Sequence, residues 1–294
     1  MELGLGTVQF GLDYGVSNKG GKVSPETVKT LLDLAYGNGI RVLDTAAAYG
    51  DSEQILGDTV TADKFFRIIT KLPGIHKETV TQAEITCLDN IFHQSLQRLK
   101  TDHIEGLLLH RPGDVFLPGG ENIYSLLCSL KEQKYVNKIG ISVYTVDELN
   151  RLFSRFDFDL VQLPLNVLDQ RFVTSGCLSE LKAKGVEIHV RSAFLQGLLL
   201  IPPEEINEFF APIKPTLVRY RSYLEENGLT AVEGALAFLR LQKNIDVVLA
   251  GVTNETELRI NINAFSKKNP PHLDFSSFTA TKENMINPQF WQLK

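Results

Sequence analysis

Short apolar runs alternate with helix-like stretches along the whole chain. The runs predict strands at 3–7, 40–43, 66–70, 104–109, 138–142, 160–163, 186–190 and 245–249. Each run is nearly continuous in apolar residues, which is typical of strands in a parallel sheet covered on both faces. Eight strand–helix units in a chain of 294 residues fit a (β/α)8 TIM barrel better than an open sheet. We therefore expect one α/β barrel domain that spans residues 1–294.

The stretches between the runs carry helix signals. They predict helices over 52–58, 81–99, 123–133, 177–184, 216–226, 230–242 and 255–264, with further helix starts near 24 and 145. Ser24 stands before Pro25, a pair that favours an N-cap followed by the first helical position. Thr145 with Glu148 three residues later has the pattern of a capping box. No Gly-x-Gly-x-x-Gly sequence joins a strand to a helix, which argues against a Rossmann domain.

Composition excludes several classes of function. The chain is 43% hydrophobic and 22% charged, with a net charge of −5, and it has no basic cluster for nucleic-acid binding. No apolar run approaches the roughly 20 residues that cross a bilayer. The cysteines Cys87, Cys128 and Cys177 are far apart and odd in number, which suits a reducing compartment, and no His/Cys cluster has the spacing of a metal site. We expect a cytoplasmic protein without metal, membrane or nucleic-acid partners.

The stretch 41–53, RVLDTAAAYGDSE, places a carboxylate where a strand ends and a tyrosine on the loop that follows. Asp44 comes directly after apolar residues, and Tyr49 follows five residues later. Asp51 or Ser52 is expected to cap the next helix, with Glu53 at the positive end of its dipole. A phenol is a weak acid in water, so Tyr49 would need a partner to transfer a proton near neutral pH.

Two candidate partners also follow apolar runs. Lys71 ends the run RIITKL, and His110 ends IEGLLLH. In a barrel, groups at the carboxyl ends of strands collect at one face. Each residue alone has an ordinary structural interpretation, as a turn former, surface charge, loop anchor or core histidine. The four together predict a site for proton chemistry.

With these four residues the chain resembles the aldo-keto reductases. The set Asp44, Tyr49, Lys71 and His110 looks like the family's catalytic tetrad, and GLGTVQFG, YGDSEQILG, GISVY, VQLPLN and AGVTNETELRIN match in place and order. The resemblance implies reduction of an aldehyde, ketone or sugar carbonyl. Hydride would come from NADPH or NADH and the proton from Tyr49. Lys71, ion-paired with Asp44, would lower the tyrosine pKa, and His110 would orient the carbonyl or relay the proton.

The resemblance also implies a cofactor site. Its residues would be Gly6, Thr7, Ser142, Gln162, Ser192, Gly251, Thr253, Glu257 and Asn261. Ser142 and Gln162 would bind the nicotinamide amide, with Asn166 near them, and Ser192 would lie beside the pyrophosphate. The family most often has Asn at the position of Val143, and usually Pro after the serine at 192.

Glu257 stands where the family often has an arginine for the 2′-phosphate of NADPH. The stretch 251–258 contains no Lys or Arg. A carboxylate repels a phosphate and accepts a hydrogen bond from a ribose hydroxyl. We therefore expect the preference for NADPH to be weak or lost, unless Arg259, Lys267 or Lys268 turns inward.

Other interpretations remain open. One alternative is a non-catalytic nucleotide-binding barrel that acts as a regulatory subunit, and another is a lyase or aldolase with Lys71 as a Schiff-base amine. We expect Arg111 either to pair with Asp114 or to bind an anionic group of the substrate. We expect Trp291 either to cover the substrate pocket or to pin the carboxy-terminal tail to the barrel wall. The segments GTVQFGLDYGVSN and VRSAFLQGLLL look similar to those of bacterial reductases in surface-polysaccharide pathways. The family usually has a hairpin ahead of the first strand, and we expect no counterpart of it here.

Overall fold

Eight short parallel strands form a closed barrel in the computed structural model, which describes residues 1–291. The strands are β1 (Glu2–Gly6), β2 (Val42–Asp44), β3 (Arg67–Leu72), β4 (Ile104–Leu109), β5 (Val136–Ser142), β6 (Leu160–Pro164), β7 (Glu187–Arg191) and β8 (Val247–Gly251). Each strand pairs with the next in sequence, and β8 pairs with β1. The predicted (β/α)8 barrel is therefore confirmed, with strand boundaries displaced by at most two residues.

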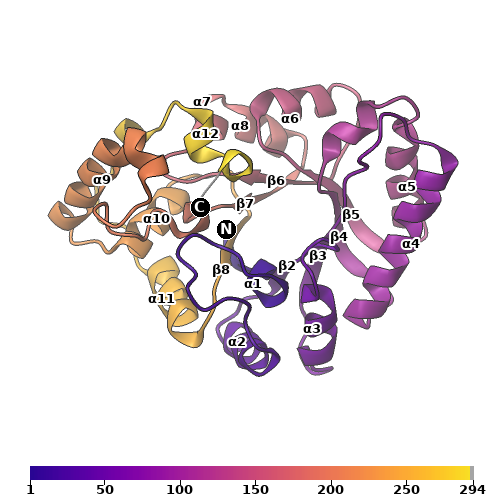
Figure 1. Ribbon diagram of the computed structural model, residues 1–294, viewed down its shortest axis with the longest axis horizontal. Coiled ribbons are helices and arrows are strands. Elements are labelled where there is room, and N and C mark those ends of the chain that lie inside the picture. The colour runs from indigo at the N-terminus through magenta and orange to yellow at the C-terminus, as the bar shows by residue number, and fades with distance from the viewer. Residues whose placement is uncertain (292–294) are drawn as a thin grey trace.

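Helices form an outer layer around the strands (Figure 1). They are α1 (Val8–Gly11), α2 (Pro25–Gly37), α3 (Ser52–Thr59), α4 (Gln82–Leu99), α5 (Glu121–Glu132), α6 (Val146–Phe153), α7 (Arg171–Thr174), α8 (Cys177–Ala183), α9 (Lys214–Glu226), α10 (Ala231–Arg240), α11 (Glu255–Ser266) and α12 (Glu283–Ile286). The single-turn helices α1, α7 and α12 carry no periodic pattern and were not expected. Within residues 1–291 no helix combines the length and apolar character needed to cross a membrane.

Side-chain caps start several of these helices. Ser24 accepts a hydrogen bond from the backbone N–H of Thr27, as expected. Thr81 and Thr230 form complete capping boxes. At α6 the box is displaced by one residue, because Glu148 accepts from the N–H of Tyr144 instead of that of Thr145.

The prediction that Asp51 or Ser52 caps α3 is wrong. Neither Asp51 nor Ser52 accepts a capping hydrogen bond. Ser52 Oγ instead donates to the carbonyl of Thr7, 2.9 Å away, and the residue is fully buried. Long-range contacts of the barrel mouth therefore override the local capping preference.

Glu53 is likewise drawn into a buried network instead of simply facing the helix dipole. Its Oε2 accepts from Nε and an Nη of Arg98 at 2.9 and 2.7 Å, and its Oε1 accepts from Thr70 Oγ1 at 2.5 Å. These bonds join α3 and α4 to strand β3. Thr70 immediately precedes Lys71, so the network fixes the strand that carries this lysine.

The apolar core has two parts. A large cluster fills the space between the sheet and the helices, and a small cluster fills the barrel interior with Val42, Ile69, Leu108, Leu160, Val247 and Leu249. Both faces of every strand are thus covered, which explains the unbroken apolar runs. At roughly 25 cal/mol per Å² of buried apolar surface, this burial is the main stabilising contribution to the fold.

Ion pairs fill the end of the barrel at the amino termini of the strands. Lys138 of β5 reaches both Glu105 of β4, at 2.6 Å, and Glu187 of β7, at 2.5 Å. Nε2 of the fully buried His189 donates to Glu187 Oε1, 2.7 Å away. Because β5 and β7 are not neighbours, these contacts cross the barrel.

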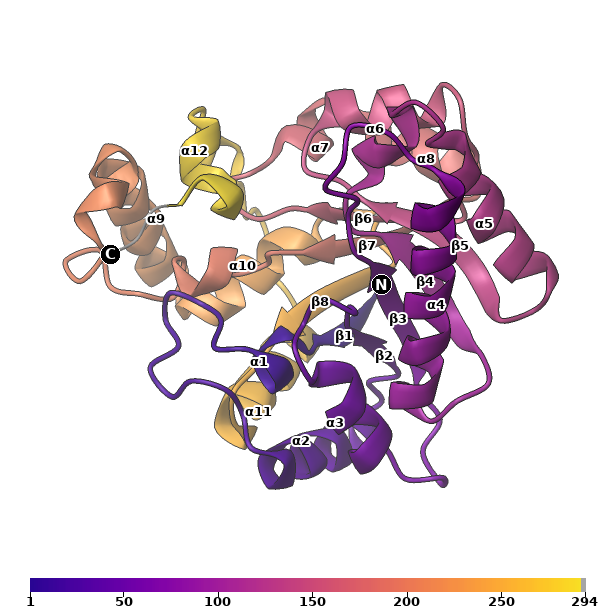
Figure 2. The same ribbon diagram turned by 45° about the vertical axis from the view of Figure 1, so that its right-hand side comes forward.

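The longest connection and the tail pack together on one side of the barrel. Between β7 and β8 lie the 3₁₀ turns 195–197 and 208–213 and helices α9 and α10. The tail carries 3₁₀ turns at 276–278 and 288–290, the first of which contacts α9, and it lies on the side of the barrel that carries α9 and α10 (Figures 1 and 2). Trp291 packs edge-on against Phe210 with ring centroids 4.8 Å apart, and it is absent from the wall of the large cavity described below. Of the two expectations for Trp291, pinning of the tail is the one observed.

The spacing of β5 and β6 depends on Gly140. A Cβ atom there would lie 2.1 Å from the carbonyl oxygen of Leu160, which is backbone and cannot rotate away. We expect Gly140→Ala to lower the free energy of unfolding by about 1–3 kcal/mol, the usual cost of overpacking. Urea unfolding measures the change.

Gly37→Ala is the matched control. Gly37 is an exposed helical glycine with nothing within 4 Å of an added Cβ, so alanine there is expected to leave stability unchanged or raise it by up to about 1 kcal/mol. Equal unfolding midpoints for Gly140→Ala and the unmodified protein would show that the two strands separate without cost.

Candidate active site

A buried ion pair lies at the base of the site. Lys71 in β3 is 1% exposed, and its Nζ donates to Asp44 Oδ1 at 2.7 Å, to Asp44 Oδ2 at 2.8 Å and to the carbonyl of Thr45 at 2.8 Å. All three N–H groups of the ammonium are therefore used. Burial lowers the pKa of Lys71, and the charge of Asp44 opposes this shift.

Gln162 of β6 completes the surroundings of Asp44. Its Nε2 donates to Asp44 Oδ1 at 2.7 Å, across the barrel. Its Oε1 is buried and has no partner among residues 1–291. The carbonyl oxygen of this side chain is therefore a buried acceptor available to a ligand, a feature that the sequence did not reveal.

Tyr49 and His110 meet above the ion pair. Their rings pack edge to face with centroids 5.8 Å apart, and Lys71 Nζ lies 5.0 Å from the centroid of the Tyr49 ring. The expected hydrogen bond from the Tyr49 hydroxyl to Lys71 or His110 is absent from the described part of the chain. The reason at Lys71 is that Asp44 and Thr45 already occupy its donors.

The pKa values of these two residues shift in directions that favour uncharged side chains. Burial raises the pKa of Tyr49 well above its usual value, the charge of Asp44 raises it further, and Arg191 opposes the shift. The resemblance implied a lowered pKa for Tyr49, whereas the net shift is upward because burial and Asp44 outweigh Arg191. Burial, together with the charges of Lys71 and Arg191, lowers the pKa of His110 to about 4. Tyr49 is protonated and His110 is neutral at pH 7.

A cavity of about 730 Å³ opens at the carboxyl ends of the strands, the size of a cofactor or substrate site. Asp44, Tyr49 and His110 line it, whereas Lys71 lies behind Asp44 and is not part of the wall. All nine residues expected at a cofactor line it as well: Gly6, Thr7, Ser142, Gln162, Ser192, Gly251, Thr253, Glu257 and Asn261. The barrel thus brings the two predicted groups into one continuous cavity.

Some of these nine residues have structural partners. Thr7 Oγ1 donates to the carbonyl of Asp44 at 2.9 Å and also contacts Ser52 Oγ. Asn166, expected near the nicotinamide, is fully buried and organises the turn that follows β6. Its Oδ1 accepts from the N–H groups of Leu168 and Asp169, and its Nδ2 donates to the carbonyl of Ser192.

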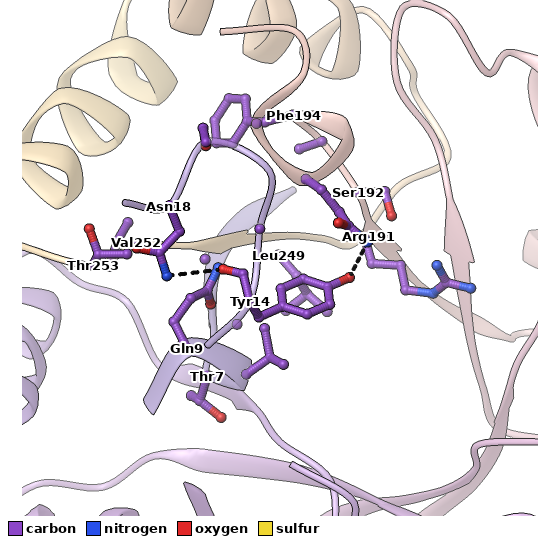
Figure 3. Close-up of a pocket in the computed structure, with 18 of the residues that line it drawn as sticks. Thr7, Gln9, Tyr14, Asn18, Arg191, Ser192, Phe194, Leu249, Val252 and Thr253 are labelled. Atoms are coloured by element: carbon purple, nitrogen blue, oxygen red, sulfur yellow. Dashed lines mark hydrogen bonds between the residues drawn. The ribbon is translucent and has the colours of Figure 1, made fainter. Parts of the chain in front are cut away.

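Residues 12–18 cross the cavity mouth and meet the turn 195–197 (Figure 3). Gln196 Nε2 donates to the Tyr14 hydroxyl at 2.9 Å, and the Gln196 carbonyl accepts from the N–H of Val16 at 3.0 Å. Ser192, Leu195 and Gln196 all have positive φ, between 48° and 62°. Such backbone strain is concentrated at functional sites, but no sequence signal marked it here.

Glu257 and Lys19 also line the cavity. Glu257 accepts from the N–H of Thr253 at 2.7 Å and from its hydroxyl at 3.0 Å. Arg259 and Lys267 pair with Glu255 and Glu233, respectively, instead of turning inward. Lys19, which sequence reasoning overlooked, lines the rim.

Arg191 was also overlooked. It is the last residue of β7 and lines the cavity, with its Nη2 donating to the carbonyl of Val143 at 3.0 Å and its Cζ 4.0 Å from the centroid of the Tyr144 ring. Arg111, by contrast, pairs with Asp114 at 3.2 Å, as the simpler expectation held. The signal for Arg191 was present, since a charged residue directly after an apolar run also marked Asp44, Lys71 and His110.

Comparison with known proteins identifies the family. The Aldo/keto reductase family model matches residues 2–280. The chain belongs to the aldo/keto reductase family. It is 26% identical to 6-dehydroglucose reductase of Agrobacterium fabrum over 252 residues, which cover 80% of this chain and 81% of that protein. Methylglyoxal reductase DkgB of Salmonella typhimurium is 25% identical over 191 residues, 63% of each chain.

The fold has a close counterpart among solved structures. The holo form of an aldo-keto reductase from Bacillus halodurans superposes with a TM-score of 0.72 at 20% identity, over 92% of this chain and 88% of that one. The protein is thus an oxidoreductase of a family that reduces small-molecule carbonyl compounds and generally uses NAD(P)H.

The lowered pKa of His110 predicts a pH dependence of stability. The unfolded chain binds a proton at this residue as pH falls through about 6.5, whereas the folded chain does so only near pH 4. The stabilising contribution is therefore complete above pH 6.5 and is lost as pH falls toward 4. Between pH 7 and pH 5 the free energy of unfolding should fall about 2 kcal/mol less in His110→Asn than in the unmodified protein.

Urea unfolding at the two pH values measures this difference. His103→Asn, at an exposed histidine, is the control and should keep the pH dependence of the unmodified protein. Identical pH dependence in His110→Asn and the unmodified protein would mean that His110 takes up a proton equally in both states.

Proposed function

We propose that this single barrel domain reduces an aldehyde or ketone group of a small molecule with NADH or NADPH, and that Tyr49 donates the proton. The observation that carries the proposal is the edge-to-face meeting of Tyr49 and His110 above the buried Lys71–Asp44 pair. Both rings line the cavity that also contains the nine residues expected at a nicotinamide dinucleotide. Acid and cofactor-binding groups thus face the same space.

The residues present fit the cofactor. Gln162 Oε1 and Gln9 Oε1 are buried acceptors without partners among residues 1–291, and both line the cavity. Ser142 and Gln162 are paired in the β5–β6 register, side by side, where they would hold the nicotinamide amide. Asn261 is buried in the wall at the other end, where it would contact the adenine. The bound cofactor supplies the hydride.

The chain's own groups supply the remaining chemistry. Because its pKa is raised, Tyr49 carries its proton at neutral pH, ready for transfer to the carbonyl oxygen. Neutral His110 has one ring N–H to donate to the same oxygen, which orients the carbonyl. The positive charge of Arg191 favours the phenolate that remains after the transfer.

The two alternatives are weaker. A Schiff-base mechanism needs a lysine that reaches the substrate, but Lys71 lies behind Asp44 with all three N–H groups bonded. A regulatory barrel would bind nucleotide without turnover. The relatives named as reductases of 6-dehydroglucose and methylglyoxal support catalysis and suggest a sugar-derived or short-chain carbonyl compound.

Replacing Tyr49 by phenylalanine tests the proton donor. The variant keeps the ring and its contact with His110 and removes only the acidic hydroxyl. General acid catalysis typically contributes 10²–10⁴-fold, so kcat for methylglyoxal should fall by about that factor. Oxidation of NADH or NADPH, followed by absorbance, gives the rate.

Cofactor affinity is the control for this variant and should be unchanged within a few-fold. Unchanged kcat in Tyr49→Phe would assign the proton to another group. If the unmodified protein binds cofactor but reduces none of a panel of aldehydes, ketones and sugars, the regulatory alternative replaces the enzyme proposal.

The cofactor's second phosphate provides a separate test. A phosphate at Glu257 would lose a charge-assisted contact worth about 1.5–3 kcal/mol, or roughly ten- to a hundredfold in affinity. We expect NADH and NADPH to bind with dissociation constants within about tenfold of each other. Fluorescence titration of both at one salt concentration measures them.

Two variants locate the source of any preference. Glu257→Gln should favour NADPH relative to the unmodified protein, and Lys19→Gln reports whether the rim lysine contacts the phosphate. If NADPH binds more than about a hundredfold tighter to the unmodified protein, the proposal for Glu257 is wrong. Loss of that preference in Lys19→Gln would then identify Lys19 as the phosphate ligand.

A further inference from the structure

Arg191 is a cation in the cavity wall without an acidic partner. Within residues 1–291, no carboxylate lies within 4.0 Å of its guanidinium, whereas Arg98 and Arg171 pair with Glu53 and Asp169. Its one protein hydrogen bond is the 3.0 Å contact from Nη2 to the carbonyl of Val143. A guanidinium has five N–H donors, so most of this group's donors remain available.

The orientation of this guanidinium is nevertheless fixed. The bond to Val143 holds one edge, and the Tyr144 ring lies against the group with its centroid 4.0 Å from Cζ. Arg191 also stands at the end of a strand, where the backbone is well defined. An arginine held in this way loses little conformational entropy on binding a planar anion.

Arg191 lies at the reacting end of the cavity. As the last residue of β7 it reaches the carbonyl of Val143, the residue after Ser142, and it lines the same cavity as Tyr49 and His110. Its charge also contributes to the lowered pKa of His110 and opposes the raised pKa of Tyr49. In Figure 3 its guanidinium points away from Asn18 and Thr253. The other cation here, Lys71, is neutralised by Asp44.

We propose that Arg191 binds an anionic group, a carboxylate or a phosphate, on the carbonyl substrate. The substrate class is then an oxo acid, an acidic sugar or a phosphorylated carbonyl compound. This assignment rests on the proposed reductase function and narrows it. Neither methylglyoxal nor 6-dehydroglucose, for which two relatives are named, carries such a group.

The chemistry of the group supports an oxyanion ligand. Arginine matches the two oxygens of a carboxylate or phosphate with parallel N–H donors, and such charge-assisted pairs are about twice as strong as neutral hydrogen bonds. Tyr49 and His110 are uncharged at pH 7, so they do not compete for the anion. One such contact is worth about ten- to a hundredfold in affinity.

The cofactor's diphosphate is a second source of the same chemistry. Ser192, expected beside it, directly follows Arg191, so both anions must be tested. If Arg191 binds the diphosphate, its replacement raises the dissociation constant of the cofactor. If Arg191 binds the substrate, its replacement reduces the discrimination between charged and neutral carbonyl compounds.

The experiment compares substrates that differ only in charge. Succinic semialdehyde and 4-carboxybenzaldehyde are each paired with the corresponding neutral amide, and kcat/KM is measured with saturating cofactor. We expect the unmodified protein to favour at least one acid over its amide by about ten- to a hundredfold. In Arg191→Gln this ratio should fall to near one, and Arg191→Lys should retain part of it.

Lys19→Gln is the matched control, because within residues 1–291 it removes the other cationic side chain that lines the cavity. It should keep the acid-to-amide ratio of the unmodified protein. A ratio near or below one for both pairs in the unmodified protein overturns the assignment. The assignment is also overturned if Arg191→Gln keeps the acid-to-amide ratio while its affinity for the cofactor falls tenfold or more. That result would mean that the guanidinium binds the diphosphate of the cofactor.

Binding measurements separate this inference from the proposed function. Calorimetry with 4-(hydroxymethyl)benzoate and 4-(hydroxymethyl)benzamide, in the presence of NADH, needs no turnover. Tighter binding of the acid, lost in Arg191→Gln, supports the anion site even if no carbonyl compound is reduced, in which case only the reductase proposal fails. Equal binding of acid and amide to the unmodified protein overturns the anion site even if neutral aldehydes are reduced.

Discussion

The buried pair of Lys71 and Asp44 is the interaction on which the rest of the site depends. Two charges inside a barrel are tolerated only when they are paired and their remaining hydrogen-bonding capacity is used. Here the ammonium has three acceptors, and the carboxylate receives donors from both Lys71 and Gln162. Strands β2, β3 and β6 are thus joined across the interior. Removal of one partner leaves an uncompensated charge, which typically costs 3–5 kcal/mol.

Above the ion pair, burial is the largest cause of the pKa shifts of Tyr49 and His110, and both side chains stay uncharged at neutral pH. Lys71 and Asp44 form the floor beneath them as a closed ion pair. Arg191 has no carboxylate within 4.0 Å among residues 1–291, and its charge contributes to the pKa shifts of Tyr49, Lys71 and His110.

The barrel and the convergence of Asp44, Lys71 and His110 could be predicted from the sequence because both follow from one local rule. Continuous apolar runs identify parallel strands, and parallel strands bring polar residues at their carboxyl ends to one face. The same rule applies to Arg191, but one arginine after a strand is not distinctive by itself. Ser52 and Glu53 show the limit of the rule. Their local pattern indicates a helix start, whereas their partners, Thr7 and Arg98, lie 45 residues away in opposite directions.

The polar atoms left without partners indicate how the cavity is divided. Gln162 donates to Asp44 through its amide nitrogen and keeps a buried carbonyl oxygen without a partner among residues 1–291, so the ion pair also orients an acceptor in the cavity wall. The guanidinium of Arg191 favours a negative group beside it, and the carboxylate of Glu257 disfavours one. On the proposed assignments, an anionic group of the substrate lies at Arg191 and ribose hydroxyls of the cofactor lie at Glu257. The charges of the wall would then act on the two ligands separately, Arg191 on the choice of substrate and Glu257 on the choice of cofactor.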